Sequence, residues 1–376
     1  MTIYVDCNAT TPLDDRVGEL VLRYLLTEYG NAGSRTHEHG MAARRAVQRA
    51  REQVAAVVET KPDEVVFTSG ATESNNLALL GLADFGRREG RTHLVSTSIE
   101  HKAVLEPLEA LQARGFEVTI VLPTAGGWVD PSVLRAAVRP DTLCVSIMQV
   151  NNETGIIQPV EQIAELLGDH PAYLHVDAAQ GFGKVDGPLR HPRIDLISLS
   201  GHKVHAPKGV GALVTRRRGY ERPPLAPLMF GGGQERGLRP GTVPVALVAG
   251  LGLAAELAAR EQKKRHKACL AFGDRLRAAL APLGPVEVGD PDRRVATTLS
   301  MRLPGIHSEA VMLALKGLVA ISNGAACTSA SYTTSHVLTA MGMAEREALE
   351  ATRWSWCHFT PEPDWGAVRG ALEGLR

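Results

Sequence analysis

Cysteine is scarce in this chain, and its few copies are widely spaced. The five cysteines are Cys7, Cys144, Cys269, Cys327 and Cys357, and no two of them form a C-x-x-C pair. This pattern supports neither a zinc site nor a disulfide framework. A sparse, odd set of thiols is typical of a reducing compartment, so we expect a cytoplasmic protein.

Long apolar runs and an excess of charge of one sign are also missing. The longest apolar run, residues 245–257, is too short to span a bilayer and contains Glu256, so it predicts a buried helix. The N-terminus lacks the layout of a signal peptide. Lys and Arg together number 41, and so do Asp and Glu, which leaves no net charge. We therefore expect no membrane association and no direct binding of nucleic acid.

What the chain does contain is a series of short apolar runs that end in small or polar residues and are followed by helical patterns. These runs are residues 64–68, 93–97, 143–147, 173–176, 196–199 and 210–214. Such runs are typical of strands buried on both faces of a mostly parallel sheet, and their alternation with helices predicts an α/β fold. Ligands bind beyond the carboxyl ends of these strands. The polar residues expected to meet there are His101, Asn152, Asp177, Gln180, Ser200 and Lys203.

The residue composition of the sequence changes after about residue 255. Residues 256–280 are dense in Ala, Arg and Lys and predict a long amphipathic helix. We expect this helix to link a large domain, residues 15–255, to a smaller α+β domain. The smaller domain would consist of residues 1–14 and 256–376.

Residues 69–75, Ser-Gly-Ala-Thr-Glu-Ser-Asn, follow a predicted strand and open a helix. Gly70 lets a ligand approach the backbone, the helix N-terminus attracts an anion, and Thr72 adds a hydroxyl group. A plain turn with a helix cap is the commoner origin of such a segment. Asp177, at the end of another strand, is likewise either a helix cap or a partner for the protonated ring nitrogen of an electron-accepting cofactor.

Lys203 follows the strand at residues 196–199 and has His202 beside it. A lysine at a strand end is usually a solvated charge. A lysine enclosed at the ligand-binding edge of a sheet instead has its pKa lowered by desolvation, which frees the amine to form a Schiff base. The anion-binding turn and Asp177 favour this second interpretation.

Three further segments carry candidate residues. Cys327 lies among small and polar residues, unlike Cys144 with its apolar neighbours, and is the best candidate nucleophile of the five cysteines. Arg353 is predicted either to bind a substrate carboxylate or to form a surface ion pair. His37 and His39 hint at a metal, but an isolated H-x-H pattern in a turn is too weak to support one.

Taken together, these segments resemble the class V aminotransferase-fold enzymes, and most closely the NifS/IscS-type cysteine desulfurases. The matching runs, which cover nearly the whole chain in the family's order, are residues 6–12, 67–76, 100–102, 150–155, 175–180, 198–203, 231–237, 241–242 and 324–330. The resemblance implies fold type I of the pyridoxal phosphate (PLP)-dependent transferases, with a mostly parallel seven-stranded sheet in the large domain. It also implies a homodimer.

The resemblance assigns roles to individual residues. Lys203 would carry PLP, Asp177 would face the pyridine nitrogen, and His101 would stack on the ring and shuttle protons. The residues holding the phosphate would be Ala71, Thr72, Ser200 and His202, joined by Thr242 from the other subunit. The ring hydroxyl would be contacted by Asn152 and Gln180, and the substrate carboxylate by Asn31, Asn152 and Arg353. Cys327 would be the sulfur acceptor, on a loop similar to the long-loop group.

The implied reaction converts L-cysteine to L-alanine, with sulfur passing to Cys327 as a persulfide and then to an acceptor protein. Cys7 and the short C-terminal tail are similar to DndA, the desulfurase of DNA phosphorothioation systems. Iron–sulfur cluster assembly and tRNA thiolation are alternative destinations for the sulfur. A selenocysteine lyase, an aminotransferase and a non-catalytic partner protein are alternative functions. The chain departs from the family at Asn31-Ala32-Gly33, where Asn-Pro is usual, and at Pro240, where Ser is common.

Overall fold

The computed structural model describes residues 2–323 and 334–376. Its largest element is a sheet of seven strands in the order β2-β8-β7-β6-β5-β3-β4. These strands are β2 (Val65–Thr68), β3 (His93–Thr97), β4 (Glu117–Val121), β5 (Thr142–Met148), β6 (Tyr173–Asp177), β7 (Leu196–Ser200) and β8 (Gly211–Thr215). All neighbouring pairs are parallel except those that involve β8, which runs antiparallel to both β2 and β7. The predicted α/β fold with a mostly parallel sheet is confirmed.

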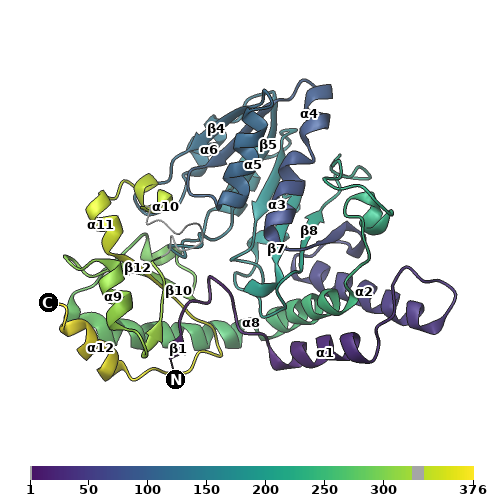
Figure 1. Cartoon of the computed structure of the whole chain (residues 1–376). Helices are drawn as coiled ribbons and strands as arrows, with labels where there is room; N and C mark the ends of the chain where they lie inside the picture. The colour runs from purple at the N-terminus through teal and green to yellow at the C-terminus, as the bar shows by residue number, and fades with distance from the viewer. Residues whose placement is uncertain (1, 324–333) are drawn as a thin grey trace.

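Helices cover both faces of this sheet, so that its strands are buried on two sides (Figure 1). One face packs against α3 (Ala71–Leu80), α4 (Ala83–Arg88) and α5 (Lys102–Gln112). The other packs against α1 (Asp15–Leu26), α2 (Glu38–Val57), α6 (Pro131–Ala136), α7 (Val160–Leu167) and α8 (Val245–Leu280). In β8, for example, Ala212 and Val214 join one core while Leu213 joins the other. Two-sided burial explains why the strand sequences are continuously apolar rather than alternating.

Helix α8 is longer than the sequence predicts. The expected buried helix at 245–257 and the expected amphipathic helix at 256–280 are one helix, Val245–Leu280. Its first part contains Gly252, where a Cβ would lie 2.4 Å from Cα of Ala50 in α2. The close approach of α2 therefore explains a glycine inside this helix, which the sequence alone did not.

A second, smaller core lies at the other end of α8. It contains an antiparallel sheet in the order β12-β10-β9 and a two-stranded parallel sheet of β1 and β11. The strands are β1 (Ile3–Tyr4), β9 (Val286–Glu287), β10 (Thr298–Arg302), β11 (Val319–Ala320) and β12 (Ala351–Ser355). The helices of this part of the chain are α9 (Ser308–Ala314), α10 (His336–Ala340), α11 (Glu345–Glu350) and α12 (Trp365–Glu373).

The apolar clusters bear on the expected domain division. Val5 packs with Cys269, Leu280 and other residues from the second half of the chain in the smaller core, whereas Ala258 belongs to the larger one. Figure 1 shows α8 running beneath both parts, with the two termini in the smaller part. We propose that residues 15–255 form one domain and residues 1–14 with 256–376 the other; Leu257 and Ala258, just past this boundary in α8, still pack in the larger core.

None of the helices in the described part of the chain combines the length and apolar character needed to cross a membrane.

Candidate active site

The carboxyl ends of β2, β3, β5, β6 and β7 meet at one edge of the large sheet, beside a cavity of about 500 Å³. The predicted site residues that line it are Ala71, Thr72, His101, Asn152, Asp177, Gln180, Ser200, His202, Lys203 and Arg353. Segments more than two hundred residues apart in the chain thus contribute to one space. The expectation that polar strand ends converge is met in the geometry of this cavity.

Lys203 lies in a short 3₁₀ turn, Gly201–Lys203, directly after β7. Its ammonium group donates hydrogen bonds to the backbone carbonyls of Asn8 (Nζ to O) and Ala9 (Nζ to O, 2.9 Å). The N-terminal segment that precedes α1 therefore forms the wall of the cavity next to this amine. The sequence did not predict a role for Asn8, because backbone carbonyls carry no sequence signal.

Asp177, the last residue of β6, is only 5% exposed. Its Oδ2 accepts a hydrogen bond from Asn75 Nδ2 at 2.7 Å, and its Oδ1 accepts one from the backbone N–H of Ala179 at 2.9 Å. The carboxylate is thus fixed in orientation by α3 and by its own turn. Asn75 was recognised in the sequence only as part of the anion-binding turn, and its contact with Asp177 appears only in three dimensions.

His101 is the N-cap of α5, where its Nδ1 accepts a hydrogen bond from the backbone N–H of Ala103 at 3.1 Å. Burial lowers the pKa of His101, the charge of Asp177 acts against this shift, and the charge of Lys203 adds to it. The imidazole is therefore favoured in its neutral form, which accepts a proton. A neutral ring is also the form suited to stacking on an aromatic group.

The opposite end of the cavity is suited to an anion. The first turn of α3, which begins at Ala71, presents backbone N–H groups there, together with the hydroxyl groups of Thr72 and Ser200. This donor set fits a phosphate group, and the partly buried amine and carboxylate fit the rest of PLP.

His202 lies in the same part of the cavity. Its pKa is lowered to about 4, first by burial and then by the charges of Lys203, Lys208 and Lys184. Its Nδ1 lies 3.2 Å from Thr10 Oγ1. A neutral His202 therefore offers a phosphate a hydrogen bond rather than a charge.

Arg353 is not at the surface, so the alternative of a surface ion pair is wrong. Its side chain is 1% exposed and forms a buried ion pair with Asp6 (Nη2 to Oδ1, 2.6 Å). Nη1 donates to the carbonyl of Asn152 at 3.1 Å, and Nε has no hydrogen-bond partner within the described residues. Strand β12 holds the guanidinium in the cavity wall.

Gln180, expected at a ring hydroxyl, lines the cavity. Its Nε2 donates to the carbonyl of Asn8 at 2.9 Å, and its Oε1 accepts from Lys184 Nζ at 3.2 Å. Both polar ends of the amide are thus engaged within the chain. The side chain lines the cavity while it fixes the Asn8 carbonyl.

Three predicted residues are not placed in the cavity. Asn31 is exposed, and its Oδ1 accepts a hydrogen bond from the backbone N–H of Gly33 at 2.8 Å. Thr242 is also exposed and does not line this cavity. Cys327 lies outside the described residues. His37, discounted as a metal ligand, caps α2, and the described residues contain no cluster able to hold a metal ion.

Sequence reasoning missed Glu100, which is completely buried next to His101. Its Oε1 accepts hydrogen bonds from Thr97 Oγ1 (2.7 Å) and from the backbone N–H of Met148 (2.9 Å). Burial raises its pKa to about 8. An acidic residue directly before a site histidine was the available signal.

Comparison with known proteins gives a consistent result. The aminotransferase class-V family matches residues 3–364. A cysteine desulfurase of Pongo abelii is 44% identical over 364 residues, which cover 96% of this chain and 79% of the relative. The crystal structure of DndA from Streptomyces lividans is 52% identical, with a TM-score of 0.83 over 93% of this chain and 98% of that one.

A third solved structure, SspA in complex with cysteine, is 37% identical, with a TM-score of 0.82 over 96% of this chain and all of the other. The match of the family to nearly the whole chain agrees with the fold and with the cavity described above. The chain belongs to the aminotransferase class-V family and, within it, to the cysteine desulfurases, which are PLP-dependent enzymes.

Proposed function

We propose that this chain removes the sulfur of L-cysteine, leaves L-alanine and places the sulfur on Cys327 as a persulfide. The observation that carries the proposal is the convergence of Lys203, Asp177 and His101 on one cavity. The solved SspA structure, which contains cysteine, supports the choice of substrate. The same cavity would suit another amino acid reaction, and Cys327 is the residue that distinguishes desulfuration.

We assign the residues that hold the cofactor from the donor set of the cavity. PLP, when bound, draws electrons from an attached amino acid and so weakens the bonds at its Cα. Lys203 would hold the cofactor covalently, and Asp177, fixed by Asn75, would pair with its ring nitrogen. The residues at the phosphate would be Ala71, Thr72, Ser200 and His202, with Thr242 supplied by a second subunit.

The remaining residues would orient the substrate and move protons. Arg353 would bind the substrate carboxylate, and Asn152 lies beside it through its backbone carbonyl. Asn31 is proposed as a further carboxylate ligand on the ground of resemblance alone. Neutral His101 would take up and return protons in the cavity. Cys327, as a thiolate, would attack the substrate sulfur.

The cofactor assignment is tested by replacing Lys203 with Ala. We expect purified wild-type protein to be yellow and Lys203→Ala to lose the visible absorbance that comes from covalent attachment. The measurement is the absorption spectrum after extensive dialysis, with Lys208→Ala, another lysine of the cavity, as the matched control. A colourless wild-type protein would favour the non-catalytic partner protein instead.

The nucleophile assignment is tested by Cys327→Ser. This variant should keep its colour and its spectral response to added L-cysteine, but we expect sulfide release in the presence of a reductant to fall by at least about a hundredfold, since a hydroxyl replaces the thiolate. Cys144→Ser, at a buried site in the sheet, serves as control. Full sulfide release by Cys327→Ser would show that another group takes the sulfur and would favour a lyase or an aminotransferase.

We further propose a DNA phosphorothioation system as the destination of the sulfur, on the basis of the similarity to DndA. Sulfur carried by Cys327 would pass to an acceptor protein rather than to DNA directly. Labelling the enzyme with ³⁵S-cysteine and identifying the cellular protein that receives the label tests this proposal. Label on an iron–sulfur scaffold or on a tRNA-thiolating enzyme would overturn it.

A homodimer is also proposed, because α1 carries a row of exposed apolar residues. Leu22, Leu25 and Leu26 are 55%, 56% and 74% exposed, and Tyr29 just beyond the helix is 73% exposed. Such a patch is costly in water and is typical of a surface that a partner covers. The cytoplasmic location stays a prediction from the cysteine pattern.

A further inference from the structure

A second, smaller cavity lies behind Lys203, on the side away from the phosphate end. Its volume is about 50 Å³, and the Lys203 side chain lines both cavities. Among the residues around it are three of the five cysteines, Cys7, Cys269 and Cys357. These positions are far apart in the sequence, so the fold alone brings the thiols together. Nothing in the proposed desulfuration uses this cavity.

Cys7 and Cys357 both line this cavity. Both are buried, at 2% and 6% exposure. The backbone N–H of Cys7 donates to the carbonyl of Ser355 at 2.9 Å, which places the N-terminal segment along the end of β12. The two thiols interact electrostatically, and each shifts the pKa of the other. The fold thus brings both thiols to the wall of one small cavity.

The Cys357 sulfur receives further stabilisation as an anion. Thr360 Oγ1 donates to it at 3.7 Å. Lys184, which is partly buried and whose pKa is lowered to about 8 by desolvation, lies within electrostatic range of both thiols. The interaction with Cys7 is the largest cause that lowers the pKa of Cys357 and, in return, raises that of Cys7.

The other titratable groups around the cavity do not oppose this charge. Burial lowers the pKa of His205 to about 3 and that of His358 to about 4, so both are neutral at neutral pH. Arg265 also lines the cavity, with its charge paired to Glu261 (2.9 Å) and Asp14 (3.6 Å). Cys269 lines the same cavity, but burial raises its pKa to about 12, which keeps it a thiol. Cys357 is thus the one thiol of these three whose pKa is lowered.

We propose that Cys7 and Cys357 form a peroxide-reactive dithiol, a modification site separate from the cofactor cavity and from Cys327. The Cys357 thiolate is the attacking group and Cys7 the resolving thiol. A hydroperoxide is the oxidant, and the cavity has room for a molecule as small as hydrogen peroxide. This inference goes beyond the proposed function and does not depend on it.

The chemistry balances in two steps. The Cys357 thiolate attacks one peroxide oxygen, the O–O bond breaks, and hydroxide leaves and takes up a proton to become water, so that Cys357 is a sulfenic acid. The Cys7 sulfur then attacks the Cys357 sulfur, the S–O bond breaks, and the departing hydroxide takes the Cys7 proton to form a second water. Both thiols are oxidised to one disulfide, and the peroxide is reduced.

The disulfide would fix the segment that contacts Lys203. Cys7 directly precedes Asn8 and Ala9, whose carbonyls accept hydrogen bonds from the lysine amine. Cys357 follows β12, the strand that carries Arg353. The modification would therefore join two walls of the cofactor cavity covalently.

The test uses the full-length, PLP-loaded protein with Cys327→Ser, so that this thiol does not compete. After exposure to equimolar hydrogen peroxide, the protein is denatured, alkylated without reductant and mapped by mass spectrometry. We expect a linked peptide containing Cys7 and Cys357, reversed by dithiothreitol, while Cys144 and Cys269 are alkylated. Free Cys7 and Cys357 after peroxide treatment would overturn the proposal, as would a link to Cys269.

Three variants assign the roles in the same background. With Cys7→Ser, Cys357 should accumulate as a sulfenic acid that dimedone traps. With Cys357→Ser, peroxide-dependent loss of the Cys7 thiol should slow by at least about tenfold, because the attacking thiolate is gone. Cys269→Ser, the matched control, should leave the linked peptide unchanged. Equal oxidation of Cys7 with and without Cys357 would contradict the assignment. Should a variant misfold, the peptide map of the Cys327→Ser protein still tests whether Cys7 and Cys357 become linked.

Discussion

Glu100 shows how strongly one environment changes one residue. It is completely buried, accepts two hydrogen bonds at Oε1, and its Oε2 has no partner within the described residues. Burial penalises the carboxylate and raises the pKa of the side chain to about 8. At neutral pH the group is thus mostly a neutral acid, placed between the backbone of β5 and the residue that caps α5.

This shift predicts a pH dependence of stability. The folded-state pKa of about 8 lies above the ordinary value of 4.5, so between these limits the native state binds a proton that the unfolded chain releases. The unfolding free energy should therefore fall as pH rises through this window. We expect Glu100→Gln, which keeps the oxygen acceptor, to be more stable than wild type at pH 8 by on the order of 2 kcal/mol.

The measurement is urea unfolding of both proteins at pH 5 and pH 8, in each case saturated with PLP because bound ligand stabilises the native state. The difference between the two proteins should be small at pH 5 and grow towards pH 8. Glu109→Gln, on the solvent side of α5, should show no such trend. An equal difference at both pH values would argue against a proton on Glu100.

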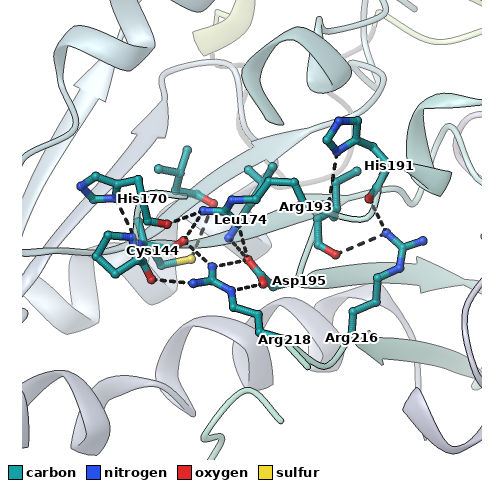
Figure 2. Close-up of polar contacts among 12 residues, drawn as sticks. Cys144, His170, Leu174, His191, Arg193, Asp195, Arg216 and Arg218 are labelled. Carbon is teal, nitrogen blue, oxygen red and sulfur yellow. Dashed lines mark hydrogen bonds and ion pairs between the residues drawn. The ribbon is translucent and has the colours of Figure 1, made fainter. Parts of the chain in front are cut away.

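At the scale of elements, the amino ends of β6 and β7 are joined by a partly buried charge network around the buried carboxylate of Asp195, shown in Figure 2. Asp195, which precedes β7, accepts hydrogen bonds from Arg193 (2.8 Å), Arg218 (2.7 and 2.8 Å) and the backbone N–H of Leu174 (2.7 Å). The two arginines also donate to the carbonyls of residues 168, 170, 171 and 172. The network lies at the end of the strands opposite to the site.

Because it lies away from the site, this network should affect stability without affecting chemistry. We expect Asp195→Asn to lower the unfolding free energy by about 3 kcal/mol, since it leaves Arg193 and Arg218 without their carboxylate. The visible absorbance of the bound cofactor should stay unchanged. Asp186→Asn, which removes an exposed ion pair with Arg190, is the matched control and should cost no more than about 0.5 kcal/mol.

Urea unfolding with and without PLP separates these effects. A loss of cofactor absorbance in Asp195→Asn under native conditions would mean that the network also supports the site. A cost equal to that of Asp186→Asn would mean that the carboxylate contributes little.

At the scale of the whole molecule, α8 connects the two cores. Leu251 and Leu257 pack in the larger core, and Phe272 and Leu276 pack in the smaller one. On the outer side of the larger part, α1 buries Val17 and Val21 and leaves its leucines exposed. One apolar face of α1 is thus buried against the rest of the chain, and the other is available to a second subunit.

The exposed face of α1 predicts a dimer that one charge would weaken. Wild-type protein should have a mass in solution close to twice that of the 40.3 kDa chain. We expect Leu26→Glu to weaken association by on the order of 2 kcal/mol, because a charge would be buried against apolar surface. Light scattering across a dilution series measures this, and Leu313→Glu on α9, an equally exposed leucine, is the control. A monomeric wild type would contradict the proposal.

The sequence by itself determined the fold class and most of the cavity. Strands buried on both faces must be continuously apolar, so they are visible in the sequence, and the carboxyl ends of parallel strands must share an edge. His101, Asp177, Ser200 and Lys203 were predicted to meet for that reason, and they do. The resemblance to the cysteine desulfurases, carried by runs along nearly the whole chain, named the family.

Only the tertiary structure decided the contacts between segments that lie far apart in the chain, because no sequence pattern links such segments. Each site group depends on the atoms that surround it, and the neighbouring residues in the sequence do not determine these atoms. Examples are the backbone carbonyls that hold Lys203, the burial of Arg353 and the pKa of Glu100. The same holds for the cysteines. Their wide spacing excluded a short-range motif, yet folding brings Cys7 and Cys357 to one small cavity, because the segment that follows β1 bridges to the end of β12 at Asp6 and Ser355.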